Sequence, residues 1–256
     1  YHLLSKHGDQ SFPDPKLEQF KIPSRKQHQD YLKIDIYSPT SLPKQIKSCL
    51  ICPGLTPKGA DDERIKNLAS VFCYLGYHVY IPHVVDYTRF KILPSTYHDI
   101  LDCFDYMYYE SNITKGVRPT IFSISFGSLL SMRLACDQKR SNLVDKVVLF
   151  GGYGSWRSVC RSLLTNKLMD GRPFKTDPRI YPVIFLHSLE HLLKGKDAKT
   201  LEHYEDLIRE YIEKTWNGDS AETSLRAKAN QILSDIDEKD KEIMLRGLGL
   251  KKNYVE

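Results

Sequence analysis

A serine at the junction of two apolar segments has the surroundings that most clearly suggest chemistry in this sequence. Ser125 lies at the centre of Ser123-Ile124-Ser125-Phe126-Gly127, after a run typical of a buried strand and before a run with helical spacing. Such a turn lifts the serine hydroxyl above the sheet edge and directs backbone N–H groups at a developing negative charge. The pattern predicts a nucleophile for acyl transfer, while a serine that merely caps the helix would have the same local sequence.

The loop after an earlier apolar run could supply a further backbone donor. Residues 47–52 have the composition of a buried strand, which ends at Pro53 and Gly54. A glycine-containing loop in this place can present an N–H group to the same oxyanion, which makes the amides of Leu55 and Phe126 the natural pair. A turn that only links a strand to a helix is the alternative.

The elements that must position these residues alternate along the chain. Apolar or alternating runs indicate strands, and runs with apolar residues three and four apart indicate helices. Buried strands separated by helices predict a mainly parallel sheet sandwiched by helices, the α/β class. We expect a half-exposed strand at 31–37, further strands at 47–52, 78–84, 118–125 and 145–153, and helices at 60–76, 94–110 and 126–138.

Three regions follow from this alternation. The first is polar, contains several prolines and has no clear period, which indicates a surface lead-in. The second holds the strand–helix alternation. The third has strong amphipathic helical patterns without further strands, which indicates a helical cap or appendage. The expected bounds are 1–28, 29–153 and 154–256.

Composition narrows the class of protein. The chain has 256 residues, 41% of them hydrophobic and 27% charged, as in a globular α/β domain, and its net charge of +5 is mild. Neither a basic stripe interleaved with aromatics nor an apolar run of membrane-spanning length occurs, so we expect no nucleic-acid binding and no membrane span. Cys49 and Cys52 have the spacing of a redox or metal pair but lie in a predicted buried strand. Reduced, buried thiols fit better, and they suit a cytoplasmic protein. The sequence begins at Tyr1, so an earlier segment of the gene product is conceivable.

Three segments together resemble the α/β-hydrolase superfamily: 51–84, 123–130 and 147–156. They are most similar to a bacterial branch with a Pro-Gly-Leu-Thr-Pro oxyanion loop, over roughly residues 30–165. The resemblance implies Ser125 as nucleophile, the Leu55 and Phe126 amides as oxyanion hole, and a helical cap. The sequence departs from the usual pattern at Ser123, where glycine is usual, and at the end of the chain.

The departure at the end concerns the rest of the catalytic triad. In this fold an Asp or Glu and then a His follow the serine along the chain. The region that contains His187 and His191 has the pattern of an apolar helix, and no acid followed by a catalytic histidine is recognisable. Three explanations stay open: the gene continues beyond this sequence, the chain is an inactive homologue that serves as a binding or interaction module, or the base is an unusual one such as His187, His191 or His83.

If the chain is active, the expected reaction is ester or thioester hydrolysis through Ser125 on a small acyl-ester or lipid-like substrate. Asp86 is a weaker candidate for an acid or a substrate contact. No cofactor is expected, and no metal either, because the charge of a helix N-terminus explains the adjacent carboxylates of Asp61 and Asp62. The oligomeric state is not predicted.

Overall fold

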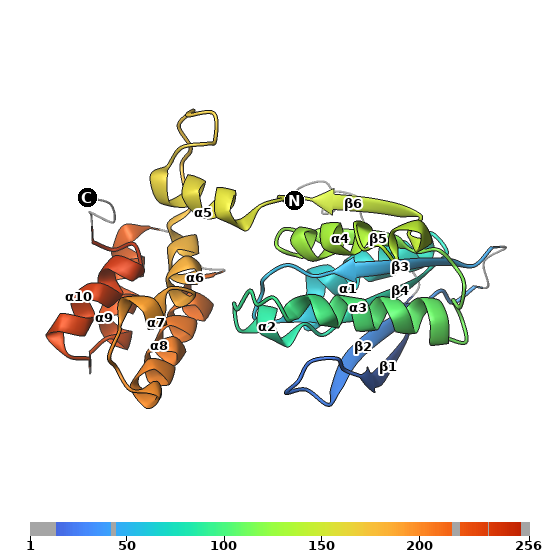
Figure 1. Ribbon diagram of the computed structural model, residues 1–256, viewed down its shortest axis with the longest axis horizontal. Coiled ribbons are helices and arrows are strands. Elements are labelled where there is room, and N and C mark those ends of the chain that lie inside the picture. The colour runs from blue at the N-terminus through green and yellow to red at the C-terminus, as the bar shows by residue number, and fades with distance from the viewer. Residues whose placement is uncertain (1–13, 42–44, 217–220, 235, 252–256) are drawn as a thin grey trace. The chain divides into compact units, whose positions relative to one another are not determined.

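The computed structural model describes residues 14–41, 45–216, 221–234 and 236–251 of the chain. They form two compact units, one up to Thr88 together with Leu93–Gly154, the other made of Arg89–Ile92 and the residues from Ser155 on. The first unit contains a six-stranded sheet in the order β1-β2-β4-β3-β5-β6, with helices on both faces (Figure 1). The strands are β1 (Lys16–Pro23), β2 (Tyr31–Ser38), β3 (Lys47–Cys52), β4 (Tyr77–Pro82), β5 (Thr120–Ile124) and β6 (Lys146–Phe150).

The pairing confirms the predicted class. Strands β4, β3, β5 and β6 run parallel to one another, while β1 and β2 join antiparallel. Parallel strands need helical crossovers, which are α1 (Glu63–Tyr74), α3 (Thr96–Asp105) and α4 (Gly127–Ala135), with the short α2 (Val85–Thr88) after β4. A mainly parallel sheet sandwiched by helices is therefore the architecture of this unit.

Two expectations for the N-terminal part were wrong. Residues 16–23 were expected in a polar lead-in, but they form β1, whose eight residues all pair with β2. The strand β2 was expected to be half exposed, but Asp35, Ile36 and Tyr37 are all buried. Both errors have one cause: β1 covers the outer edge of β2, so β2 is an interior strand with helices on its faces.

Helix α1 forms the core on one face of the sheet. Asp62 caps its N-terminus by accepting a hydrogen bond from the Arg64 amide, as the paired aspartates suggested. Arg64 in turn lowers the pKa of Asp62 to about 2. The buried side chains that gather under this helix alternate along the strands and lie four residues apart on α1: Tyr37, Cys49, Ile51, Ala60, Ile65, Ala69, Cys73, Val79 and Ile81.

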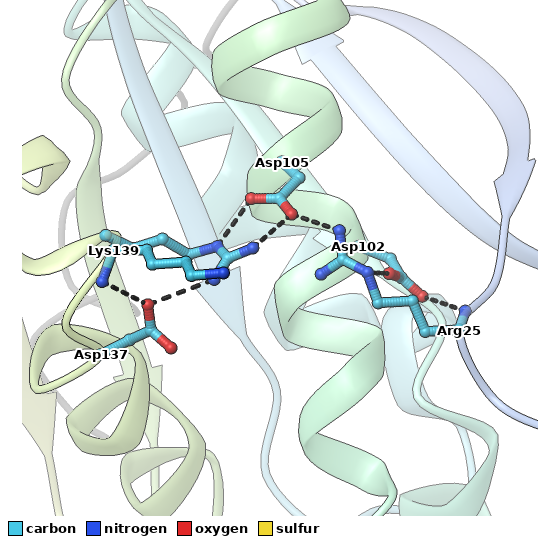
Figure 2. A network of polar contacts seen from close by, with 6 residues as sticks. Arg25, Asp102, Asp105, Asp137 and Lys139 are labelled. Atoms are coloured by element: carbon cyan, nitrogen blue, oxygen red, sulfur yellow. Dashed lines mark hydrogen bonds and ion pairs between the residues drawn. The ribbon is translucent and has the colours of Figure 1, made fainter.

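Helix α3 is tied by carboxylates to the segment between β1 and β2. The Arg25 amide donates to Asp102, and its guanidinium contacts Asp105, which also accepts from Arg140 at 2.6 and 2.7 Å (Figure 2). One turn earlier the Lys26 ammonium lies 2.6 Å from the fully buried carboxylate of Asp99. These ion pairs fasten the antiparallel margin of the sheet to the helix layer.

The second unit is helical, as the amphipathic patterns predicted. The segment of His187 and His191 forms two short helices rather than one. Apart from a single β-bridge between Lys167 and Pro173, its described residues contain no strand. Its helices are α5 (Trp156–Thr165), α6 (Tyr181–Leu186), α7 (Leu189–Leu192), α8 (Ala198–Trp216), α9 (Glu222–Ile232) and α10 (Glu238–Gly247).

Two expectations from composition can be compared with the described residues. Cys49 and Cys52 lie buried in β3 as free thiols, and burial raises the pKa of Cys52 to about 12. None of the helices in the described ranges combines the length and the apolar character needed to cross a membrane.

Candidate active site

Ser125 occupies a sharp turn between β5 and α4. Its φ is +49°, in the left-handed region that a side chain with a Cβ rarely adopts. The turn is held by two backbone hydrogen bonds: the Ser125 amide donates to the Phe150 carbonyl at 2.9 Å, and the Ser125 carbonyl accepts from the Ser128 amide at 3.0 Å. Strain of this kind costs roughly 1–2 kcal/mol and persists where the surrounding structure enforces it.

Gly127 shows why a small residue stands two positions after the serine. A Cβ at this position would lie 2.4 Å from the Cys52 carbonyl oxygen and 2.6 Å from that of Pro53. No side chain fits there, because both obstacles are backbone atoms at the end of β3. The same close approach brings Gly54 next to the nucleophile turn, where a Cβ would lie 3.4 Å from the Ser125 Cβ.

Ser123, the departure from the usual glycine, is accommodated by the sheet. Its side chain is fully buried, and its hydroxyl lies 3.3 Å from the Val148 carbonyl of β6 and 3.4 Å from the Ser128 hydroxyl. A small polar side chain with these partners satisfies its hydrogen bonds. The substitution therefore leaves the turn intact.

The proposed oxyanion donors lie on the two segments that meet at this turn. Leu55 is buried in the loop after β3, and its amide makes no hydrogen bond to any residue in the described parts of the chain. Phe126 is buried at the N-terminus of α4, where the Tyr87 hydroxyl donates to its carbonyl at 3.1 Å and the Tyr153 ring packs edge-on against its ring. Tyr87 thus fixes the peptide that follows the Phe126 amide.

A base for Ser125 is not part of this arrangement. Among the described residues of the first unit, the Ser125 hydroxyl makes no hydrogen bond to another side chain. His83, the candidate in the first unit, follows β4 and has its Nε2 2.9 Å from a carboxylate oxygen of Asp35. The structure therefore pairs His83 with an acid, and it shows no contact between His83 and the serine.

Asp86 is bound by two donors of the first unit. It lies in α2 and accepts from the Lys26 ammonium at 2.7 Å and from the Thr96 hydroxyl at 2.8 Å. Both donors bind Oδ2, so Oδ1 keeps its acceptor capacity, and the role of Asp86 as an acid or a substrate contact stays a prediction.

The remaining candidates belong to the second unit. His187 follows α6, and its Nε2 accepts a hydrogen bond from the Ile92 amide at 3.2 Å, which requires a lone pair on that nitrogen. Burial of the ring lowers the pKa of His187, in keeping with a neutral imidazole. His191 is exposed in α7. The roles of His187 and His191 as a base for Ser125 stay predictions.

Comparison with known proteins gives a likeness of fold. A scan of protein-family models and a search of curated proteins find no match for the chain. Among solved structures, it is similar to a dienelactone hydrolase from Anabaena variabilis ATCC 29413, at 17% identity and a TM-score of 0.43, over 54% of this chain and 64% of that one.

Two esterases are also similar to the chain. Esterase Est22 has 16% identity and a TM-score of 0.46, over 56% of this chain and 47% of its own. Brefeldin A esterase, a bacterial homologue of human hormone-sensitive lipase, has 15% identity and a TM-score of 0.44, over 52% and 39%. The chain thus spans between 39% and 64% of the length of these three proteins.

Sequence reasoning missed two residues of this region. Tyr87, whose buried hydroxyl holds the Phe126 carbonyl, gives no sequence signal, because a tyrosine in a short loop is common. Asp35, the partner of His83, did leave a signal: it is an acidic residue inside the apolar strand Tyr31–Ser38. A carboxylate at a buried position has a partner, and the sequence does not say which residue that is.

Proposed function

We propose that the first unit is the nucleophile-bearing part of a serine acyl hydrolase that cleaves esters or thioesters through Ser125. The observation that carries this proposal is the φ of +49° at a residue with a side chain, on a strand–turn–helix junction that Gly127 allows to close. Backbone strain at such a junction raises the hydroxyl out of the sheet, which a helix cap does not require.

In the proposed reaction the Ser125 oxygen attacks the acyl carbonyl carbon while its proton passes to a general base. The carbonyl oxygen becomes an oxyanion, which the amides of Leu55 and Phe126 would bind. The alcohol or thiol leaves with the proton from the base. Water then repeats the sequence on the acyl-serine and releases the acid.

The base is the open part of this proposal. A serine hydroxyl without a base is a poor nucleophile. His187 and His191 are candidates from the second unit, and a residue outside the described parts of the chain is another. The substrate class follows only from the chemistry: a small acyl ester or a lipid-like ester. The apolar side chains of α6 add little support for a lipid-like substrate, because Val183, Phe185 and Leu186 are buried.

A second function has an observation of its own. Because the Ser125 hydroxyl has no histidine partner among the described residues of the first unit, a catalytically inactive homologue that acts as a binding or interaction module is the alternative. The two functions differ in one property, which is whether Ser125 is activated.

Labelling with a fluorophosphonate probe separates them. We expect the wild-type chain to be labelled at one site, the label to vanish in Ser125→Ala, and the exposed Ser41→Ala to be labelled like wild type. Circular dichroism of each variant shows that it is folded. Failure of the folded wild-type chain to react would contradict the proposal and favour the binding module.

A further inference from the structure

Three side chains from separate elements of the first unit converge on one point. Asp35 comes from β2, Asp61 from the 3₁₀ turn that precedes α1, and His83 from the end of β4. A carboxylate oxygen from each aspartate and a ring nitrogen from the histidine all lie within 4.8 Å of one another. The backbone explains the convergence: Asp35 is opposite Ile81 in the β2–β4 ladder, so His83, two residues on, shares its face of the sheet.

The contact between His83 and Asp35 is an ion pair when the imidazole is protonated. Nε2 of His83 lies 2.9 Å from the Asp35 oxygen, yet this buried nitrogen has no aligned partner among the described residues. When the imidazole is neutral with its proton on Nδ1, a lone pair of Nε2 faces the carboxylate, and a cation bound between the two groups would attract both. Neighbouring ligands of a tetrahedral metal ion, each roughly 2.1 Å from it, are about 3.4 Å apart, so three atoms that all lie within 4.8 Å of one another can approach one ion after small side-chain adjustments.

A buried hydroxyl faces the same place without a partner. Tyr37 follows Asp35 by two residues in β2 and therefore projects from the same face of the sheet. It is 4% exposed, and its hydroxyl has no hydrogen-bond partner in the described ranges. The Tyr37 side chain is therefore buried on the face of the sheet that carries Asp35.

The charges around the cluster leave it negative. Asp35 is 1% exposed and accepts a hydrogen bond from the Gln19 amide nitrogen at 2.9 Å. Two lysines also act on this region: Lys33 attracts the Asp35 carboxylate, and the Lys66 ammonium donates to Glu63 at 3.0 Å. Glu63 chiefly, and Asp61 and Asp35 at longer range, raise the pKa of Lys66. Two carboxylates and one imidazole thus share a site that attracts a cation.

We infer that Asp35, Asp61 and His83 form a binding site for a divalent transition-metal ion, with Zn²⁺ as the best-suited ion. One imidazole nitrogen and two carboxylate oxygens are ligands that Zn²⁺ accepts, and a fourth position remains for water. Mg²⁺ and Ca²⁺ prefer all-oxygen ligands, so the histidine disfavours them. The unpartnered Tyr37 hydroxyl would then donate to a ligating carboxylate or to the bound water.

The site would tie a loop to the sheet. Asp61 lies in the connection between β3 and α1, whereas Asp35 and His83 belong to strands or their ends. An ion shared by the three fixes the far end of that connection, which also carries Leu55. This effect is independent of whether Ser125 is catalytic.

Zn²⁺ titration by isothermal calorimetry tests the site, on chain purified without a polyhistidine tag. We expect one Zn²⁺ per chain in the wild type. Asp61→Asn and His83→Gln should each weaken binding at least tenfold, because each removes a ligand. Asp145→Asn and His191→Gln change an exposed aspartate and an exposed histidine and should leave the affinity unchanged. Mg²⁺ should bind at least tenfold more weakly than Zn²⁺.

Folding and location are checked separately. Asp61 is exposed, so its variant should melt at the wild-type temperature without metal, and an unchanged melting temperature excludes misfolding as the cause of lost binding. Co²⁺ gives a second readout through its visible absorption, which both ligand variants should reduce. A folded wild-type chain that does not bind Zn²⁺, binding that neither ligand variant weakens, or equal binding of Mg²⁺ would overturn the inference.

Discussion

The two margins of the sheet differ in what their outer strands expose. At the β1 margin, apolar residues such as Leu17 and Phe20 alternate with charges: Lys16 pairs with Glu18, and Lys21 lies 4.1 Å from the Tyr31 ring. At the β6 margin, four consecutive apolar residues are between 38% and 62% exposed: Val147, Val148, Leu149 and Phe150. Both are edges of the sheet within the described chain.

A strand can therefore lie at the edge of a sheet without having the charged sequence that is typical of edge strands. Charged residues on an outer strand oppose pairing with another chain, and β1 has them. The apolar run of β6 is typical of a strand that is covered on both faces, as parallel strands usually are. The β1 margin is also fastened by the ion pairs to α3, whereas β6 has the parallel ladder to β5.

The largest effect is expected where the β1 margin is fastened. Lys26→Met removes the counter-charge of Asp86 and of the fully buried Asp99, and an uncompensated buried charge costs about 3–5 kcal/mol of unfolding free energy. Lys16→Met, which breaks an exposed pair, should cost under about 1 kcal/mol. Urea melts of both variants measure the difference. Equal losses would show that the buried pairs do not fasten this margin.

A matched pair of leucines compares the two margins directly. Leu32 in β2 is fully buried, and Leu149 in β6 is 42% exposed. Leu32→Ala should cost about 3 kcal/mol, since it leaves a cavity, and Leu149→Ala less than about 1 kcal/mol. The free energy of unfolding of each variant decides. If Leu149→Ala is as costly as Leu32→Ala, β6 is covered in solution.

A smaller effect is expected from pH at the β1 margin. Burial raises the pKa of Asp99 to about 6, because it outweighs the attraction of Lys26, and Asp86 and Asp102 add a smaller repulsion. Between the unfolded pKa near 4 and this value the folded state holds a proton that the unfolded state has lost. This group therefore stabilises the fold at low pH, and its contribution decreases as the pH rises from about 4 to about 6, by on the order of 2 kcal/mol.

Asp99→Asn isolates this contribution from the other carboxylates. The asparagine cannot ionise, so the stability of the variant relative to wild type should increase between pH 4.5 and pH 7. Chemical denaturation at the two pH values measures the change. A difference between variant and wild type that is the same at both pH values would contradict the raised pKa.

The sequence was sufficient to predict features that depend on residues close together along the chain. The alternation of strands and helices, the Ser125 turn and the cap of α1 by Asp62 all follow from local patterns. The strand β1 did not, because its imperfect alternation becomes a strand only through pairing with β2. The meeting of Asp35, Asp61 and His83 was also hidden, since it depends on which loops end at the same edge of the sheet.

The candidate catalytic residues likewise divide into those that local sequence predicts and those that it does not. Local sequence places Ser125 and Phe126 at a strand–helix turn and Leu55 in the loop after β3, where the structure also has them. A general base is brought to such a serine by distant chain segments, and the pattern around His187 and His191 carries no information on where these histidines lie. Residue types alone therefore predict a nucleophile and leave its base open.

The backbone conformation of Ser125 affects how the residue at this position would change during evolution. At a φ of +49° glycine is the least strained residue, and serine carries a standing penalty of roughly 1–2 kcal/mol. A lineage with no use for the hydroxyl would gain stability by exchanging it for glycine. Ser125→Gly is thus a stabilising substitution that would inactivate the chain. A chain that keeps serine keeps its hydroxyl at the cost of a less stable fold.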